Sequence, residues 1–122
     1  MGKPVDRSTR RWQRLVAFRR DNRVLRQREF YTGLPNSRGV ADLTWHGTEL
    51  SAPGWSDPDG RALACTLGGL DGEPDLHVLM NMYWEPLEFQ LMPIPGRGWS
   101  RAIDTALPAP ADIVPPGAEQ AV

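Results

Sequence analysis

The stretch RALACTLGGLDGEPDLHVLMNMYWEPLEFQLM, residues 61–92, carries the clearest strand pattern in the chain. Apolar residues dominate 61–69 and 76–83, and apolar and polar residues alternate over 87–92. Such runs, bounded by Gly, Pro and Asp, are typical of β-strands. We therefore expect a buried strand over 61–69, followed by a β-hairpin whose strands, 76–83 and 87–92, meet at the corner Trp84–Pro86.

Shorter segments on either side predict two more strands. VADLTWHG, residues 40–47, and WSRAID, residues 99–104, carry spaced apolar residues between loops rich in Gly, Pro, Asn and Ser. The run Asp57–Gly60 is a strong turn signal ahead of the buried strand. Strands at this spacing predict an all-β fold, a small antiparallel β-sandwich with one N-terminal α-helix.

The N-terminal helix is expected from STRRWQRLVAFRRDN, residues 8–22, which has the helical period. We place the helix at about residues 9–21, with arginines around most of its surface. Because a helix this short is marginal without a tertiary partner, its apolar face should pack against the sheet. That face consists of Trp12, Leu15, Val16 and Phe18.

The net charge of −1 conceals a strong asymmetry along the chain. Residues 1–30 hold ten basic and three acidic residues, for a net +7, and residues 31–122 have a net −8. Such asymmetry can indicate a nucleic-acid-binding arm or a helix attached to an acidic neighbour. The apolar residues interleaved with the arginines favour packing, so we expect no nucleic-acid partner.

The one cysteine, Cys65, lies in the apolar run ALACTL. We expect a small buried side chain there rather than a reactive thiol. A single cysteine forms no internal disulfide, which favours a cytoplasmic protein. No run approaches the roughly 18 to 20 apolar residues that a membrane span needs, so no membrane partner is expected.

The sequence offers no catalytic or metal-binding constellation. His46 and His77 have no second ligand two or four residues away, and we expect His77 to be a strand residue with a local hydrogen bond. The glycines of TLGGL do not match a phosphate-binding spacing. Nothing pairs Glu85 or Glu88 with a general acid. We therefore predict no catalytic residue, no metal and no cofactor.

Aromatic residues are the one feature that suggests a ligand. Tyr83 and Trp84 lie beside Glu85 at the predicted corner, where flat rings could stack on sugars while the carboxylate binds hydroxyl groups. Large aromatic side chains more often fill a core or an interface. Asn81 is expected to be a buried amide that fixes the strand register. The chain has five tryptophans in all: Trp12, Trp45, Trp55, Trp84 and Trp99.

Several segments together resemble bacterial glycogen debranching enzymes, the isoamylase-type members of glycoside hydrolase family 13. RRWQRLVAFRRDNRVLRQREFYTG is similar to the last helix of their catalytic barrel and the exit segment after it. Four further motifs follow in the same order over the rest of the chain. The matching positions in those motifs include Asp42, Trp45, Trp55, Asp57, Arg61, Asn81, Pro86, Trp99 and Asp104.

The resemblance implies a division of the chain into residues 1–34, a remnant of the last barrel helix, and residues 35–122, a C-terminal β-sandwich with a Pro-rich tail. It implies a non-catalytic domain that stabilises the (β/α)₈ barrel of a glycogen-debranching α-1,6-glucosidase. An α-glucan-binding module that uses Tyr83, Trp84 and Glu85 is the alternative. A nucleic-acid-binding protein that uses the arginine-rich helix is a third class.

The tail from Thr105 onward carries four prolines and is expected to be extended or poorly ordered. The family resemblance implies one more closing strand, and the prolines make such a strand improbable within 105–122. We therefore expect an uncovered sheet edge or helix face that favours a two-fold homodimer.

Overall fold

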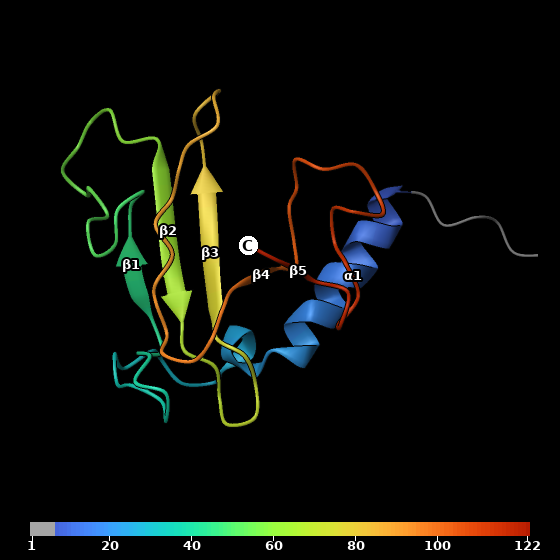
Figure 1. The fold of residues 1–122 in the computed structure, drawn as a ribbon, viewed down its shortest axis with the longest axis horizontal. Helices are drawn as coiled ribbons and strands as arrows, with labels where there is room; N and C mark the ends of the chain where they lie inside the picture. The colour runs from blue at the N-terminus through green and yellow to red at the C-terminus, as the bar shows by residue number, and fades with distance from the viewer. Residues whose placement is uncertain (1–6) are drawn as a thin grey trace, which may run out of the picture. The chain divides into compact units, whose positions relative to one another are not determined.

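The computed structural model describes residues 7–122. The chain forms two compact units, one made of the described residues up to Asp21 together with Gly96–Val122, the other of Asn22–Pro95. All paired strands are antiparallel, and α1 (Arg7–Asp21) is the one α-helix among residues 7–122 (Figure 1). The expected all-β class with an N-terminal helix is confirmed. The family-based division at residue 34 stays a prediction.

The larger unit contains a sheet in the order β1–β2–β3, formed by β1 (Thr44–His46), β2 (Ala62–Leu67) and β3 (Leu76–Asn81). Central strand β2 is paired on both sides, and its last four residues are buried. Strands covered on both faces have continuous apolar runs rather than alternating ones. This explains why ALACTL could be identified as a buried strand from sequence.

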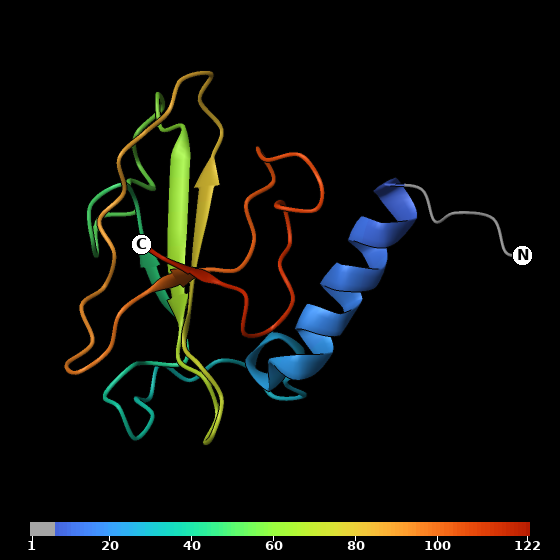
Figure 2. The same cartoon turned by 45° about the vertical axis from the view of Figure 1, so that its right-hand side comes forward.

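The hairpin of this sheet joins β2 to β3, so the predicted hairpin between 76–83 and 87–92 is wrong. Strand β3 pairs with β2 and ends at Asn81, and residues 87–92 form no strand. They cross the front of the sheet, the face toward the viewer in Figure 1, and Figure 2 shows the same arrangement. Gln90 donates its backbone N–H to the Thr48 carbonyl (2.8 Å). An alternating pattern indicates that one face of a segment is covered. This is true of a segment that crosses a sheet as well as of a strand paired within it.

The turn between β2 and β3 depends on the two glycines of TLGGL. A Cβ atom at Gly68 would collide with the backbone carbonyl of Val40, and one at Gly69 with that of Pro74. Only a residue without a side chain permits this close approach of neighbouring backbones. These glycines therefore have a packing role.

A buried carboxylate fixes the same turn. Asp75 accepts hydrogen bonds from Nε and Nη2 of Arg38 (2.8 and 2.7 Å), from Nδ2 of Asn36 (2.8 Å) and from the backbone N–H of Gly69 (2.9 Å). Although burial raises the pKa of Asp75, these hydrogen bonds outweigh it and hold the pKa below its ordinary value. The β2–β3 turn is thereby tied to the loop that precedes β1.

The rear face of the sheet carries the hydrophobic core of the larger unit. The 3₁₀ helix η1 (Arg23–Arg26) places Val24 in this core, and Tyr31 donates its hydroxyl to the Val24 carbonyl (2.7 Å). Cys65 is buried there, as expected, and burial raises the pKa of its thiol. The cluster comprises Val24, Cys65 and Leu67, with Leu25, Leu43 and Leu76 packed against it.

The front face of the sheet contains a chain of hydrogen bonds between two histidines. His46 Nδ1 accepts from the backbone N–H of Ser51 (2.8 Å), so its Nε2–H donates to Thr66 Oγ1 (2.8 Å). The Thr66 hydroxyl then donates to His77 Nδ1 (2.8 Å), and the two rings stack at 5.3 Å. Burial lowers the pKa of both imidazoles, that of His77 to about 4 with a contribution from His46. Both rings are therefore neutral at pH 7.

The smaller unit is held together by ion pairs to Asp112. The Arg10 Nη1 lies 2.9 Å from this buried carboxylate, and the Arg11 Nη2 lies 3.1 Å from it. Trp12 is 70% exposed within this structure. The sheet belongs to the other unit, so the expected packing of the apolar helix face against it stays a prediction. Leu15 and Val16 are also exposed, and Arg10 and Arg11 join the helix to Asp112 of the same unit.

The tail is more ordered than its composition suggested. Strand β5 (Gln120–Ala121) returns to pair with β4 (Ser100–Arg101), and Ile103 forms a bridge with Ile113. The four prolines lie outside these paired segments. Residues 105–122 therefore fold back within the smaller unit. The expected homodimer stays a prediction.

We predict that Gly69→Ala destabilises the protein, because its new methyl group would overlap the Pro74 carbonyl. Overpacking of this kind costs about 1–3 kcal/mol of unfolding free energy. Denaturant unfolding of both variants measures the effect against Gly98→Ala, where an added Cβ meets nothing within 4 Å. Equal stability of the two variants would contradict the close-approach role.

We also predict that stability falls as the pH drops from about 6.5 toward 4. The unfolded histidines titrate near 6.5, whereas the folded rings resist protonation, so the unfolded state binds more protons in this interval. Thermal unfolding across that range should show a smaller decline for His77→Gln, which keeps a hydrogen-bond acceptor for Thr66 but does not titrate. A wild-type midpoint that is constant from pH 6.5 to 5 would be incompatible with the neutral pair.

Candidate functional site

The corner after β3 is closed by the side chain of Asn81. Its Nδ2 donates to the Glu85 carbonyl (3.0 Å), and its Oδ1 accepts from the backbone N–H of Tyr83 (2.9 Å). The side chain is exposed, so the prediction of a buried amide is wrong. Asn81 fixes its own turn, and Pro86 follows that turn at an exposed position.

Two aromatic rings are held together at this corner. The ring centroids of Tyr83 and Trp84 lie 4.2 Å apart at an angle of 33°. The Arg61 guanidinium carbon lies 5.8 Å from the Trp84 ring centroid, within the range of a cation–π contact. Trp84 is nevertheless 75% exposed. Glu85 is exposed beside it, so the three residues predicted from sequence do lie together.

A hollow of about 320 Å³ lies next to the aromatic pair. Tyr83 and Thr48 line it, together with Asp57, Asp59 and Arg61 from the loop before β2. Three short-range hydrogen bonds shape this loop. Asp57 N–H donates to the Gly54 carbonyl (2.9 Å), Gly60 N–H to the Asp57 carbonyl (3.2 Å), and Asp59 N–H to Asp57 Oδ1 (2.9 Å).

The hollow was not predicted from the sequence. The turn signal of Asp57–Gly60 was visible, but its proximity to Tyr83 depends on the β2–β3 pairing. Met82 N–H donates to the Arg61 carbonyl (2.8 Å), which extends that pairing by one residue beyond β3. This bond brings the end of β3, next to Tyr83, close to the start of β2, next to the loop Asp57–Gly60.

A second surface lies on the rear face of the sheet. Trp45 is opposite Cys65, which is opposite Val78, so one row of side chains crosses all three strands. Trp45 also contacts Trp55 edge to face, with ring centroids 5.6 Å apart. We use the term rear patch for Trp45, Trp55, Val78 and Met82, which are 39%, 66%, 37% and 65% exposed.

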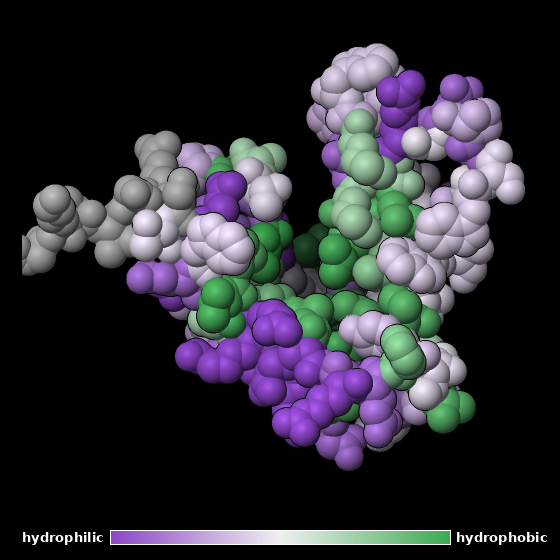
Figure 3. All heavy atoms as spheres, turned by 180° about the vertical axis from the view of Figure 1, so that it is seen from behind, coloured by the Kyte–Doolittle hydropathy of each residue, from purple (hydrophilic) through white to green (hydrophobic). Residues whose placement is uncertain are grey.

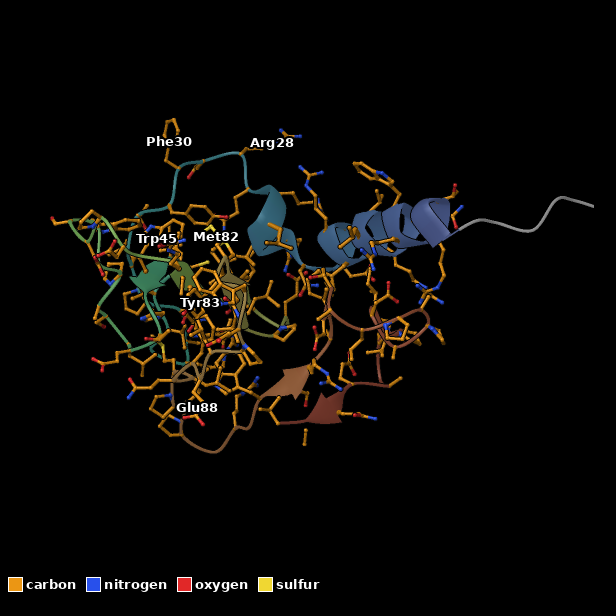
Figure 4. All side chains as sticks on the ribbon, turned by 90° about the horizontal axis from the view of Figure 1, so that it is seen from above. Arg28, Phe30, Trp45, Met82, Tyr83 and Glu88 are labelled. Atoms are coloured by element: carbon orange, nitrogen blue, oxygen red, sulfur yellow. The ribbon has the colours of Figure 1, made fainter. Side chains whose placement is uncertain are left out.

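The figures show where the rear patch lies. Apolar side chains, in green, gather over the strands when the molecule is seen from behind (Figure 3). Trp45 and Met82 lie on the same side of the sheet as Phe30, whereas Glu88 lies on the opposite side (Figure 4). Phe30 is 96% exposed.

Asp42, another position singled out by the sequence motifs, anchors a loop. Its carboxylate accepts from the backbone N–H groups of Thr32 (2.6 Å) and Gly33 (2.7 Å). Although burial raises the pKa of Asp42, these bonds and that of the Thr32 hydroxyl hold it below the ordinary value. The carboxylate shapes the segment that leads to β1.

Trp99 and Asp104, two further positions singled out by the sequence motifs, lie in the smaller unit. The Trp99 carbonyl accepts from the backbone N–H of Val122 (3.0 Å), and Asp104 N–H donates to the Asp112 carbonyl (2.8 Å). The Asp104 carboxylate accepts from Ala106 N–H (3.0 Å). Both residues join the tail to the strand segment before it.

Metal-binding clusters and membrane-spanning helices are both absent from residues 7–122. No group of three or more His, Cys, Asp and Glu side chains there could hold a metal ion. In the same part of the chain, no helix has both the length and the apolar composition to cross a membrane.

Comparison with known proteins gives a consistent result. The family described as Isoamylase 1-3, C-terminal, matches residues 44–121. Isoamylase 3, chloroplastic, from Oryza sativa subsp. japonica is 28% identical over 104 residues, which cover 84% of this chain but only 12% of that protein. No solved structure gives a significant match. Because the family match spans most of the chain, including both candidate surfaces, this protein belongs to the family of isoamylase C-terminal domains.

Proposed function

We propose that this chain is the non-catalytic C-terminal domain of a glycogen-debranching α-1,6-glucosidase of glycoside hydrolase family 13. Its role is to stabilise the (β/α)₈ catalytic barrel of that enzyme in the cytoplasm. The family match over residues 44–121 supports the domain assignment. In the rice relative the matched region is 12% of the protein, so a domain of this kind is joined there to a much larger remainder.

The rear patch is the observation that carries the stabilising role. A contiguous exposed apolar patch on a soluble domain marks an interaction surface. The patch contains two tryptophans and a methionine, residue types that are enriched in protein interfaces. Its core neighbours, Cys65 and Leu67, are already buried beneath η1, so a partner can extend the same hydrophobic core.

We predict that this chain raises the melting temperature of an isoamylase-type barrel produced without its own C-terminal domain. Val78→Lys should abolish the effect, because it places a charge in the proposed interface. Leu79→Lys is the matched control, since Leu79 is the next residue of β3, is 45% exposed and points to the other face. Equal behaviour of the two variants in differential scanning fluorimetry would argue against this surface.

We also predict that the chain alone hydrolyses no glycosidic bond. Glycogen or pullulan incubated with the purified protein should release reducing sugar only at the rate seen with a heat-denatured sample. Release above that rate, reproduced with independent preparations, would refute the non-catalytic assignment.

A second candidate function is α-glucan binding through Tyr83, Trp84 and Glu85. The packed but exposed ring of Trp84 favours it, because a large apolar face is held open to solvent at a fixed corner. Binding and barrel stabilisation use different faces of the sheet and are compatible with each other.

A further inference from the structure

We propose that the hollow beside Tyr83 is a binding site for one pyranose ring of an α-glucan chain, with the exposed face of Trp84 as the platform for the next ring. The choice of glucan rests on the proposed function. The choice of a sugar rests on the chemistry of the lining residues.

The lining combines an aromatic wall with charged hydrogen-bonding groups. Tyr83 supplies a ring, while Asp57 and Asp59 supply carboxylates and Arg61 supplies a guanidinium. A pyranose has the complementary pattern, an apolar C–H face and a rim of hydroxyl groups that both donate and accept. Hydrogen bonds between neutral and charged groups are stronger than neutral pairs.

Other ligand classes fit the hollow less well. Two carboxylates against one guanidinium oppose phosphates and other anions, which need a surplus of donors. Apolar side chains, among them Pro53 and Leu87, form only part of the lining, whereas a hydrophobic ligand needs a mostly apolar cavity. The volume of about 320 Å³ is at the lower end of the range for small-molecule sites, as expected for a single ring.

Trp84 does not line the hollow, but its ring contacts two residues that do. Tyr83 lies 4.2 Å from its ring and Arg61 lies 5.8 Å from it, centre to centre. A chain that leaves the hollow past Arg61 would therefore pass over Trp84. This arrangement favours an oligosaccharide over a monosaccharide.

The site is formed before any ligand binds. Asn81 fixes the backbone at Tyr83, two backbone hydrogen bonds shape the loop Gly54–Gly60, and the Asp59 N–H holds the Asp57 carboxylate. A rigid site avoids part of the entropic cost of ordering side chains on binding. In contrast to the sequence-based hypothesis, the hydroxyl-binding carboxylates here are Asp57 and Asp59.

The test is isothermal titration of the full 122-residue chain with maltohexaose, with cellohexaose as the comparison sugar. We expect saturable binding of maltohexaose that Tyr83→Ala and Asp59→Asn each weaken at least about tenfold. Phe30→Ala and Glu88→Gln are the matched controls, because both residues are exposed and neither lines the hollow. Both controls should bind like the wild type.

Two outcomes would overturn the inference: no binding of maltohexaose at millimolar concentrations, or binding that both hollow variants retain. Circular dichroism verifies folding, and Asp59→Asn serves if Tyr83→Ala fails to fold, since Asp59 is exposed and its substitution is nearly isosteric. The barrel-stabilisation assay separates this inference from the proposed function. A hollow variant that still stabilises the barrel shows that loss of sugar binding leaves the domain's other role intact.

Discussion

The arrangement of the larger unit depends on the buried carboxylate of Asp75. It lies at the start of β3 and accepts hydrogen bonds from Arg38, Asn36 and Gly69, which belong to the loop before β1 and to the turn after β2. One side chain thus connects the approaches to all three strands. A buried carboxylate is stable only with such partners, so the burial of Asp75 and the course of these loops require each other.

The functional surfaces follow from the strand pairing that this turn sets. Once β2 and β3 are in register, the Met82 N–H reaches the Arg61 carbonyl and the chain turns at Asn81. Tyr83 then lies beside the loop that enters β2, although the whole of β2, the turn and β3 separate the two in sequence. The hollow is therefore a consequence of the hairpin, and its residues come from the two open ends of the same strand pair.

Sequence patterns predicted the helices and strands that are determined by their own residues. The helix has a periodic pattern, and β2 has apolar residues on both faces, so each could be placed from its own residues. The segment 87–92 misled us because an alternating pattern indicates one covered face and does not identify a strand partner. The pairing of His46 with His77 through Thr66 could not be predicted, since it depends on the register of three strands.

Two consecutive residues divide the proposed roles of the domain. By the alternation of side chains along β3, Met82 lies on the rear face with Val78. Tyr83 lines the hollow together with Ala62, which lies on the front face of β2. Because side chains alternate along an extended chain, a shift of one residue would exchange the two surfaces. Thr66 opposes such a shift, since its hydroxyl group bonds His46 on β1 and His77 on β3 only in this register. A buried hydroxyl group on the central strand therefore helps to keep the proposed interface and the candidate sugar site on opposite faces.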